Sequence, residues 1–320
     1  MQRVNGRRHG KFAAVIAVLL MLVMIAGCGA GKEQGGQAAT TTLPSGSEQK
    51  ETADQSKTEA AAAADSWDGS QTASSGTLTV VASPGIHTEI LKMAQIVLAG
   101  QGIDLVIDSE FDDYMMPNLL VDGGVYDCNY FQHEEYLTTF NAEQGTDLVS
   151  VGKIHFEPLG IYRGKKWSLD DLASGDVITI PRDTANQARA LKLLSDAQLI
   201  GLAQGKEMEA SIADIKDNPK GIKIELMDAS QIASAVANSA FVVMNGNYAR
   251  QALYKLTSDA IAYESPASAT AERYANIIAV NRQNVDDPRV QALVKVLQSE
   301  DVRTFIDTKC GGEVVPYTGS

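Results

Sequence analysis

Cysteine, histidine and basic residues are all scarce in this sequence of 320 residues. Three cysteines are too few for a disulfide scaffold or for a zinc site made of four thiolates. The 27 lysines and arginines are outnumbered by 40 aspartates and glutamates, for a formal charge of −13. This balance argues against a nucleic-acid partner, because such binding needs a basic face. The sequence also contains no Walker A, GxGxxG, GxSxG, HExxH or CxxC motif. We therefore expect neither an enzyme nor a cofactor.

Residues 1–27 have the features of a signal peptide. Four basic side chains precede an apolar run of about fifteen residues at 12–26, which is short for a membrane span but typical of a signal sequence. The run ends in Ile25, Ala26, Gly27 and Cys28, which resembles a bacterial lipobox. The lipobox implies that Cys28 is acylated and holds the protein on the extracytoplasmic face of the cell membrane. An uncleaved membrane helix is the alternative.

Residues 28–76 comprise this cysteine and a segment rich in small and polar residues, which predicts a flexible linker. The chain from residue 77 predicts an α/β fold, because short apolar runs alternate with helical periodicity. Strands are expected at 77–82, 105–107, 177–180, 222–226, 241–244, 261–263 and 277–280, and helices at 184–194, 288–297 and 301–308. A further helix is expected with Ser83 as its N-cap, Pro84 at its first position and Gly100 at its end.

Strands alternating with helices predict parallel sheets that are covered on both faces. The strand near residue 277 and the last helices have no obvious partner in the middle of the chain. We therefore predict two lobes joined by two crossings, with lobe 1 formed by 77–158 plus 276–317 and lobe 2 by 159–275.

Aromatic side chains make up only 6% of the chain, yet Tyr126, Tyr130, Phe131 and Tyr136 fall in one short segment. Such rings can pack on an apolar ligand, and a thioether sulfur interacts favourably with them. A core strand that runs into a helix explains the cluster equally well.

Polar residues follow two of the predicted strands. Arg189 lies in the first turns of a helix, where a guanidinium suits a carboxylate, although a solvated helix charge also fits. Asn245 and Asn247 follow the strand at 241–244. Ligands of open α/β sheets bind beyond the carboxyl ends of strands, but asparagine and glycine are also ordinary turn residues.

Seven stretches of the sequence, in this order, carry a resemblance to a known family: 111–114 (FDDY), 117–119 (PNL), 129–137 (NYFQHEEYL), 145–153 (GTDLVSVGK), 217–220 (DNPK), 245–249 (NGNYA) and 274–276 (YAN). From residue 77 to residue 317 the chain resembles the NlpA/MetQ family of methionine-binding lipoproteins, the substrate-binding subunits of methionine ABC importers. It departs from the family at Glu135, where proline is common, and at 267–273, where residues are inserted.

The resemblance implies a type II periplasmic-binding-protein-like fold of two α/β lobes with the ligand between them. By resemblance, Arg189 pairs with the ligand carboxylate, and Asn245 and Asn276 bind the amino-acid backbone. The residues implied to enclose the ligand side chain are Tyr114, Phe131, His133 and Tyr136. The implied ligand is L-methionine or a relative such as D-methionine or a methionyl dipeptide, delivered to an ABC permease and its ATPase.

Two other functions were weighed. One is a metal-ion-binding lipoprotein of an ABC importer, which would use His87, His133, His155 and Glu157. The sequence shows no histidine-rich loop and no close histidine pair, so we expect no metal site. The other is a surface lipoprotein with an adhesin or structural role. Cys128 and Cys310 remain after lipidation, and an oxidising compartment would permit but not require a disulfide between them.

Overall fold

Residues 75–266 and 269–319 are described by the computed structural model of the chain. The signal peptide, Cys28 and nearly all of the predicted linker lie outside the described residues, as do residues 267–268 of the predicted insertion. Among the described helices, none combines the length and the apolar character needed to cross a membrane.

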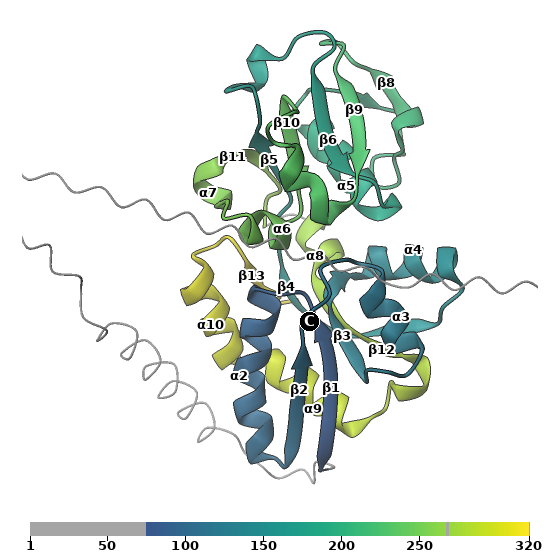
Figure 1. Ribbon diagram of the computed structural model, residues 1–320, viewed down its shortest axis with the longest axis vertical. Helices are drawn as coiled ribbons and strands as arrows, with labels where there is room; N and C mark the ends of the chain where they lie inside the picture. The colour runs from purple at the N-terminus through teal and green to yellow at the C-terminus, as the bar shows by residue number, and fades with distance from the viewer. Residues whose placement is uncertain (1–74, 267–268, 320) are drawn as a thin grey trace, which may run out of the picture. The chain divides into compact units, whose positions relative to one another are not determined.

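Six strands form the first sheet, in the order β13–β4–β12–β3–β1–β2 (Figure 1). Their bounds are Gly76–Ala82 (β1), Ile103–Asp108 (β2), Cys128–His133 (β3), Leu148–Phe156 (β4), Asn276–Asn281 (β12) and Val315–Pro316 (β13). β1 is parallel to β2 and β3, whereas β12 is antiparallel to both of its neighbours, β3 and β4. The prediction of parallel strands is confirmed for β1, β2 and β3 but was wrong for β12, because this late strand enters the sheet in the reverse direction.

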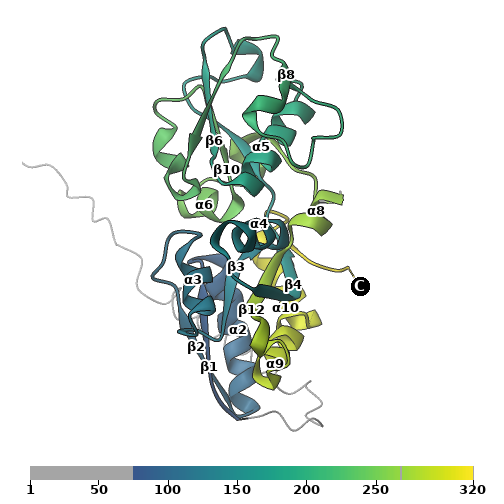
Figure 2. The same ribbon diagram turned by 90° about the vertical axis from the view of Figure 1, so that its right-hand side faces the viewer.

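Helices cover both faces of this sheet. They are Ile86–Gly100 (α2), Met116–Asp122 (α3), Glu134–Gln144 (α4), Pro288–Leu297 (α9) and Glu300–Cys310 (α10), with a short 3₁₀ turn at Arg282–Asn284 (η4). Alternate residues of β1 point to opposite faces, so Val80 packs with α2, α9 and α10 while Val81 packs with α3 and α4. In Figure 2 the yellow-green α9 and α10 lie beside the blue α2.

The second sheet has five strands in the order β11–β5–β10–β6–β9. Their bounds are Gly160–Arg163 (β5), Val177–Pro181 (β6), Lys223–Met227 (β9), Phe241–Met244 (β10) and Ala260–Tyr263 (β11). β6 is parallel to β9 and β10, and β5 is antiparallel to β10 and β11. A separate strand pair is formed by Gly201–Leu202 (β7) and Ile215–Asp217 (β8).

Three α-helices and three 3₁₀ turns accompany the second sheet: Thr184–Asp196 (α5), Gly246–Gln251 (α6), Leu256–Asp259 (α7), Leu169–Asp171 (η1), Ile212–Asp214 (η2) and Ala229–Ala235 (η3). The short helix Ala269–Tyr274 (α8) contacts α4 and β4 of the first sheet. Apolar residues of α5, such as Leu191, form one core with Ile178 and Phe241 of the sheet. Residues of η3, such as Ile232, pack with Val242. Val242 follows Phe241 in β10 and therefore lies on the opposite face of the sheet.

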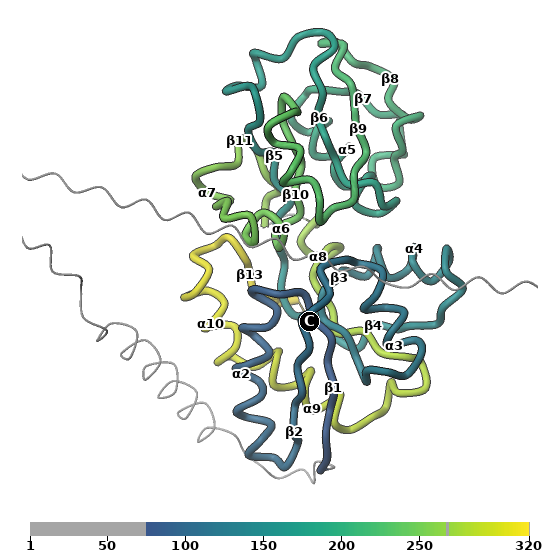
Figure 3. Tube along the Cα trace, in the orientation of Figure 1, coloured from purple at the N-terminus to yellow at the C-terminus, as the bar shows by residue number. Residues whose placement is uncertain are grey.

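The described chain passes between the two sheets twice. It leaves β4 and enters β5 through residues 157–159, and it returns from β11 to β12 through residues 264–275. The tube in Figure 3 follows the chain through both crossings. The described residues all belong to one compact unit.

The start of α2 differs from the prediction. The helix begins at Ile86 rather than Pro84, and its N-cap is Gly85 rather than Ser83. Gly85 has a φ of 91°, a conformation that costs glycine little but strains other residues. The turn of the glycine backbone therefore sets where the helix begins, and the hydroxyl of Ser83 does not.

Candidate functional site

One small cavity is lined by all seven residues predicted to bind a ligand: Tyr114, Phe131, His133, Tyr136, Arg189, Asn245 and Asn276. The same cavity is also lined by Gln132, Glu157, Asn186, Gly246 and Asn247. Its volume is about 20 Å³, space for roughly one or two water centres. The fold thus gathers residues that are up to 162 positions apart in the sequence around one point, and their roles there stay a prediction.

The aromatic wall of the cavity comes from β3, from the start of α4 and from the segment between β2 and α3. The ring of Tyr114 lies 5.6 Å from that of Phe131 and 5.5 Å from that of Tyr136, between centroids. β3 is buried along its whole length and α4 follows it directly. Of the aromatic cluster noted in the sequence, Phe131 and Tyr136 line the cavity, whereas Tyr130 belongs to an apolar core and Tyr126 packs against another. A core strand that runs into a helix therefore describes the cluster, and packing of its rings on a ligand stays a prediction.

His133 is both the N-cap of α4 and a wall of the cavity. Its Nδ1 accepts a hydrogen bond from the backbone N–H of Tyr136 at 3.1 Å, which leaves Nε2 to donate to Asn186 Oδ1 at 3.0 Å. Burial, assisted by the charge of Arg189, lowers the pKa of His133 to about 3. The ring is therefore neutral at physiological pH and presents a hydrogen bond rather than a charge.

Asn186 links the two sides of the cavity and was not predicted. Besides His133, it contacts Asn245, whose Nδ2 donates to Asn186 Oδ1 at 2.9 Å. Asp183, the N-cap of α5, holds the amide of Asn186 in place at 2.9 Å. Asn186 precedes Arg189 by three residues, so the two share one face of the helix. That spacing was a signal in the sequence that could have identified Asn186.

A second bond between the two sides joins Tyr114 to Asn247. The hydroxyl of Tyr114 donates to Asn247 Oδ1 at 2.7 Å. Tyr114 lies between β2 and α3, and Asn247 lies in the first turn of α6. The place of Asn247 after a strand end is compatible in the sequence with a ligand site or with ordinary turn chemistry, and Asn247 was not among the predicted ligand residues.

Arg189 is buried and already carries an ionic partner within the chain. Its Nε lies 2.8 and 3.0 Å from the two carboxylate oxygens of Glu264, and its Nη2 lies 2.5 Å from Glu264 Oε2. Nη2 also donates to the backbone carbonyl of Glu157 at 2.8 Å. Burial alone would lower the pKa of Arg189, but the charge of Glu264 outweighs it and raises that pKa. Nη1 forms no hydrogen bond with the part of the chain that the structure describes.

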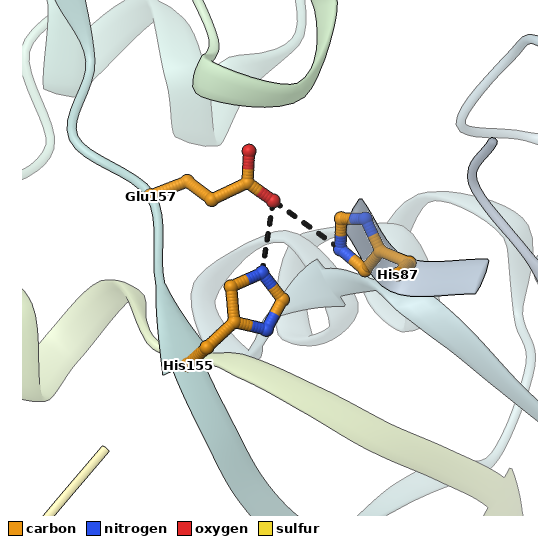
Figure 4. A group of neighbouring side chains, drawn as sticks. All are labelled: His87, His155 and Glu157. Carbon is orange, nitrogen blue, oxygen red and sulfur yellow. Dashed lines mark hydrogen bonds and ion pairs between the residues drawn. The ribbon is translucent and has the colours of Figure 1, made fainter. Parts of the chain in front are cut away.

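Two histidines and a glutamate lie together beside the cavity (Figure 4). His155 Nε2 lies 2.9 Å from Glu157 Oε1, and His87 Nε2 lies 3.5 Å from the same oxygen. His87 and His155 are 68 positions apart in the sequence, yet the fold brings their rings to 4.8 Å between centroids. Pairing of β12 with β4 places Asn276 opposite His155, and Asn276 Oδ1 lies 3.0 Å from His87 Nε2.

These three residues are the group, within residues 75–266 and 269–319, that could hold a metal ion. Their possible ligand atoms all lie within 4.8 Å of one another, and two imidazoles with a carboxylate suit several transition metals. An ion would have to replace the bonds from the two Nε2 atoms to Asn276 and Glu157. Burial lowers the pKa of His87 to about 4, so this imidazole is neutral near pH 7.

Three atoms at the cavity are buried without a hydrogen-bond partner among the described residues: Glu157 Oε2, Asn245 Oδ1 and Asn247 Nδ2. Leaving such an atom unpaired costs about 1–3 kcal/mol, and more when it is charged. The cavity therefore offers two hydrogen-bond acceptors and one donor to any polar group that enters it.

A larger groove of about 570 Å³ lies on the other side of the aromatic wall. Tyr114 and Tyr136 line both spaces, and the groove adds Tyr248 together with the charged side chains of Arg182 and Asp183. The rings are thus the shared wall between the small cavity and the groove.

Cys128 and Cys310 are both buried and free. Burial raises the pKa of the Cys310 thiol to about 11 and that of Cys128 still further. The two side chains belong to one apolar core beneath the first sheet. The disulfide that the sequence left open is therefore not formed.

The family described as NlpA lipoprotein matches residues 78–318. The methionine-binding lipoprotein MetQ of Bacillus subtilis is 37% identical over 246 residues, covering 75% of this chain and 88% of that protein. A putative lipoprotein from Ruminococcus gnavus has a solved structure with a TM-score of 0.74 and 45% identity, covering 75% of this chain and 99% of that one. A nutrient binding protein from Burkholderia cenocepacia, solved bound to methionine, has a TM-score of 0.68 and 36% identity over the same shares. These likenesses confirm the predicted type II periplasmic-binding-protein-like fold of two α/β lobes with a cleft between them.

Proposed function

The chain belongs to the NlpA lipoprotein family, and on that premise we propose that it is a substrate-binding lipoprotein of an ABC importer. The proposed ligand is L-methionine or a close relative such as D-methionine or a methionyl dipeptide. Two relatives support this ligand, because MetQ of Bacillus subtilis is named a methionine-binding lipoprotein and the Burkholderia cenocepacia protein was solved with methionine.

The observation that carries the proposal is the composition of the cavity. Aromatic rings of Tyr114, Phe131 and Tyr136 can enclose a thioether, for which ring faces and edges are favourable neighbours. Arg189 would bind the carboxylate through its free Nη1, with Asn245 and Asn276 holding the rest of the amino-acid backbone. Rings and polar groups at one point fit an amino acid with an apolar, unbranched side chain.

The cavity is too small for methionine, so binding of this ligand would need the two lobes to separate. Pockets for small molecules commonly have volumes of about 300–1,000 Å³, far above the cavity volume of about 20 Å³. We propose that residues 77–158 plus 276–317 move against residues 159–275, with the bend at the two crossings. Ligand would shift the population between an open and a closed form.

We also propose how the protein is placed and what it meets. Acylated Cys28 would anchor it on the extracytoplasmic face of the cell membrane, after removal of residues 1–27 and with 28–76 as a tether. Its partners would be an ABC permease and the ATPase bound to that permease. The protein would deliver ligand without catalysing a reaction.

Isothermal titration of the protein, stripped of bound ligand by unfolding and refolding, tests the ligand. We expect saturable heat with L-methionine, and Arg189→Ala should weaken binding by about 2–5 kcal/mol, as for a desolvated charge pair. The matched control is Arg182→Ala, which removes an exposed arginine paired with Asp228 in the outer groove. The absence of heat with L-methionine, D-methionine and methionyl dipeptides would overturn the ligand assignment.

A further inference from the structure

Glu157 is the one carboxylate among the described residues that line the cavity. It follows β4 directly, at the start of the first crossing between the sheets. Its side chain is only 5% exposed. A carboxylate held out of water in this way requires partners for both of its oxygens.

The two oxygens of Glu157 have different surroundings. Oε1 accepts a hydrogen bond from His155 and lies near His87, whereas Oε2 has no partner among the residues that the structure describes. Figure 4 shows Oε2 directed away from both imidazoles. On that side lies Gly246, where an added Cβ would come within 2.9 Å of Oε2 and 2.7 Å of the Glu157 Cβ. Because Gly246 also lines the cavity, Oε2 lies at the cavity edge and not in the apolar core.

The charged groups around the cavity leave Glu157 Oε2 without a charged partner among the described residues. The charge of Arg189 is matched by Glu264. His133, which lines the cavity, is held neutral, since burial lowers its pKa to about 3. Oε1 lies 2.9 Å from His155 Nε2, whereas Oε2 has no such contact with the described residues. The cavity therefore contains a carboxylate oxygen that lacks a cationic hydrogen-bond donor.

We propose that Glu157 Oε2, together with Asn245 Oδ1, accepts the hydrogen bonds of the ligand's α-ammonium group. Asn245 Oδ1 is the other unpartnered acceptor at the cavity, so one ammonium can satisfy both atoms. Asn247 Nδ2 and Arg189 Nη1 remain as donors for the carboxylate at the other end of the zwitterion. The inference rests on the proposed function, and it adds that Glu157 makes a free amino group a requirement for binding.

His155 and His87 have a supporting role in this arrangement. They fix Oε1, and with it the direction of Oε2, by contacts of 2.9 and 3.5 Å. Tyr130 bonds His155 Nδ1 and so holds that ring from the side opposite Glu157, whereas Asn276 Oδ1 bonds the same His87 Nε2 that lies near Glu157. They are positioning residues, because their nitrogens contact Glu157 and not the cavity.

The test compares two ligands on wild-type protein and on Glu157→Gln by isothermal titration. The ligands are L-methionine and 4-(methylthio)butanoate, which differ in the ammonium group alone. Wild-type protein should prefer methionine by at least about 30-fold, the lower end of what a desolvated charge partner contributes. In Glu157→Gln the preference should fall to about threefold or less. The matched control is Glu143→Gln, which removes an exposed carboxylate from the outer groove and should keep the full preference.

The outcomes separate this inference from the proposed function. If wild-type protein does not bind methionine, the proposed function fails. If it does bind methionine but Glu157→Gln weakens both ligands equally, the assignment of Glu157 alone is overturned. If the variant does not fold, wild-type protein decides, because binding of 4-(methylthio)butanoate within threefold of methionine would refute the role of Glu157. Loss of methionine binding on treatment with EDTA would also refute it, since the triad would then be a metal site.

Discussion

The ion pair between Arg189 and Glu264 holds the second crossing of the chain against α5. Its side chains are 4% and 7% exposed, and their nearest atoms lie 2.5 Å apart. Glu264→Gln keeps the shape of the side chain and removes its charge, which leaves Arg189 buried without a counter-ion. Removing one partner of a buried pair costs about 3–5 kcal/mol. We expect the free energy of unfolding of the ligand-free protein to fall by that amount.

The double variant Arg189→Met/Glu264→Leu should be far more stable than the two single changes suggest. Replacing a whole buried pair by apolar side chains of similar size is often neutral or stabilising by about 1–4 kcal/mol. Urea unfolding of the wild type, both single variants and the double variant gives the coupling energy of the pair. The control cycle is the exposed pair Arg182 and Asp228, whose coupling should be about 0–1 kcal/mol.

Two results would refute this reasoning. A loss below about 1 kcal/mol for Glu264→Gln would match an exposed pair and would mean that Arg189 is not desolvated. Additive costs in the cycle would mean that the two side chains do not depend on each other. The double variant should also be folded and unable to bind methionine, which separates the role of Arg189 in the ligand site from its role in stability.

Three further predictions concern pH, a bridging hydroxyl and the thiols. Burial lowers the pKa of His87 from 6.5 to about 4. As the pH drops, His87 is therefore protonated in the unfolded chain before it is protonated in the folded protein. The free energy of unfolding should fall by about 3 kcal/mol between about pH 6.5 and about pH 4. Urea melts at several pH values should show this fall as a difference between wild type and His87→Gln, and parallel curves would contradict it. Tyr114→Phe removes the bond of 2.7 Å to Asn247 and should weaken methionine binding by about 0.5–1.5 kcal/mol; an unchanged titration would count against a role for this bond in closure. Alkylation of the untreated, denatured protein followed by mass spectrometry should label both Cys128 and Cys310, and an unlabelled pair would disagree with the free thiols of the structure.

Local patterns in the sequence were enough to identify most of the elements. The strand at Phe241–Met244 and the helix at Pro288–Leu297 have the predicted bounds. In the first case an apolar run is followed by Asn-Gly, and in the second proline occupies the first helical position after an aspartate cap. The direction of β12 could not be read in this way, because the pairing of a strand depends on contacts far away in the sequence.

The site was partly accessible from the sequence for a similar reason. The residues of 129–137 (NYFQHEEYL) are contiguous, so a short stretch carried both the ring cluster and the histidine cap. Glu264 gave no comparable signal, because its partner Arg189 lies 75 positions away and only the return of the chain to the first sheet brings them together. The same holds for His87 and Glu157, whose proximity depends on the neighbouring ends of α2 and β4.

The two crossings place constraints on how this receptor could evolve. Each of the two backbone connections between its halves begins with an acid that touches the binding region, Glu157 in one and Glu264 in the other. A substitution of either acid would therefore change both a connection between the lobes and the polar groups at the cavity. With the proposed opening at these crossings, the rate of opening and the affinity for ligand would be coupled through these residues, and separate adjustment of either property would have to come from the aromatic wall or from more distant surfaces.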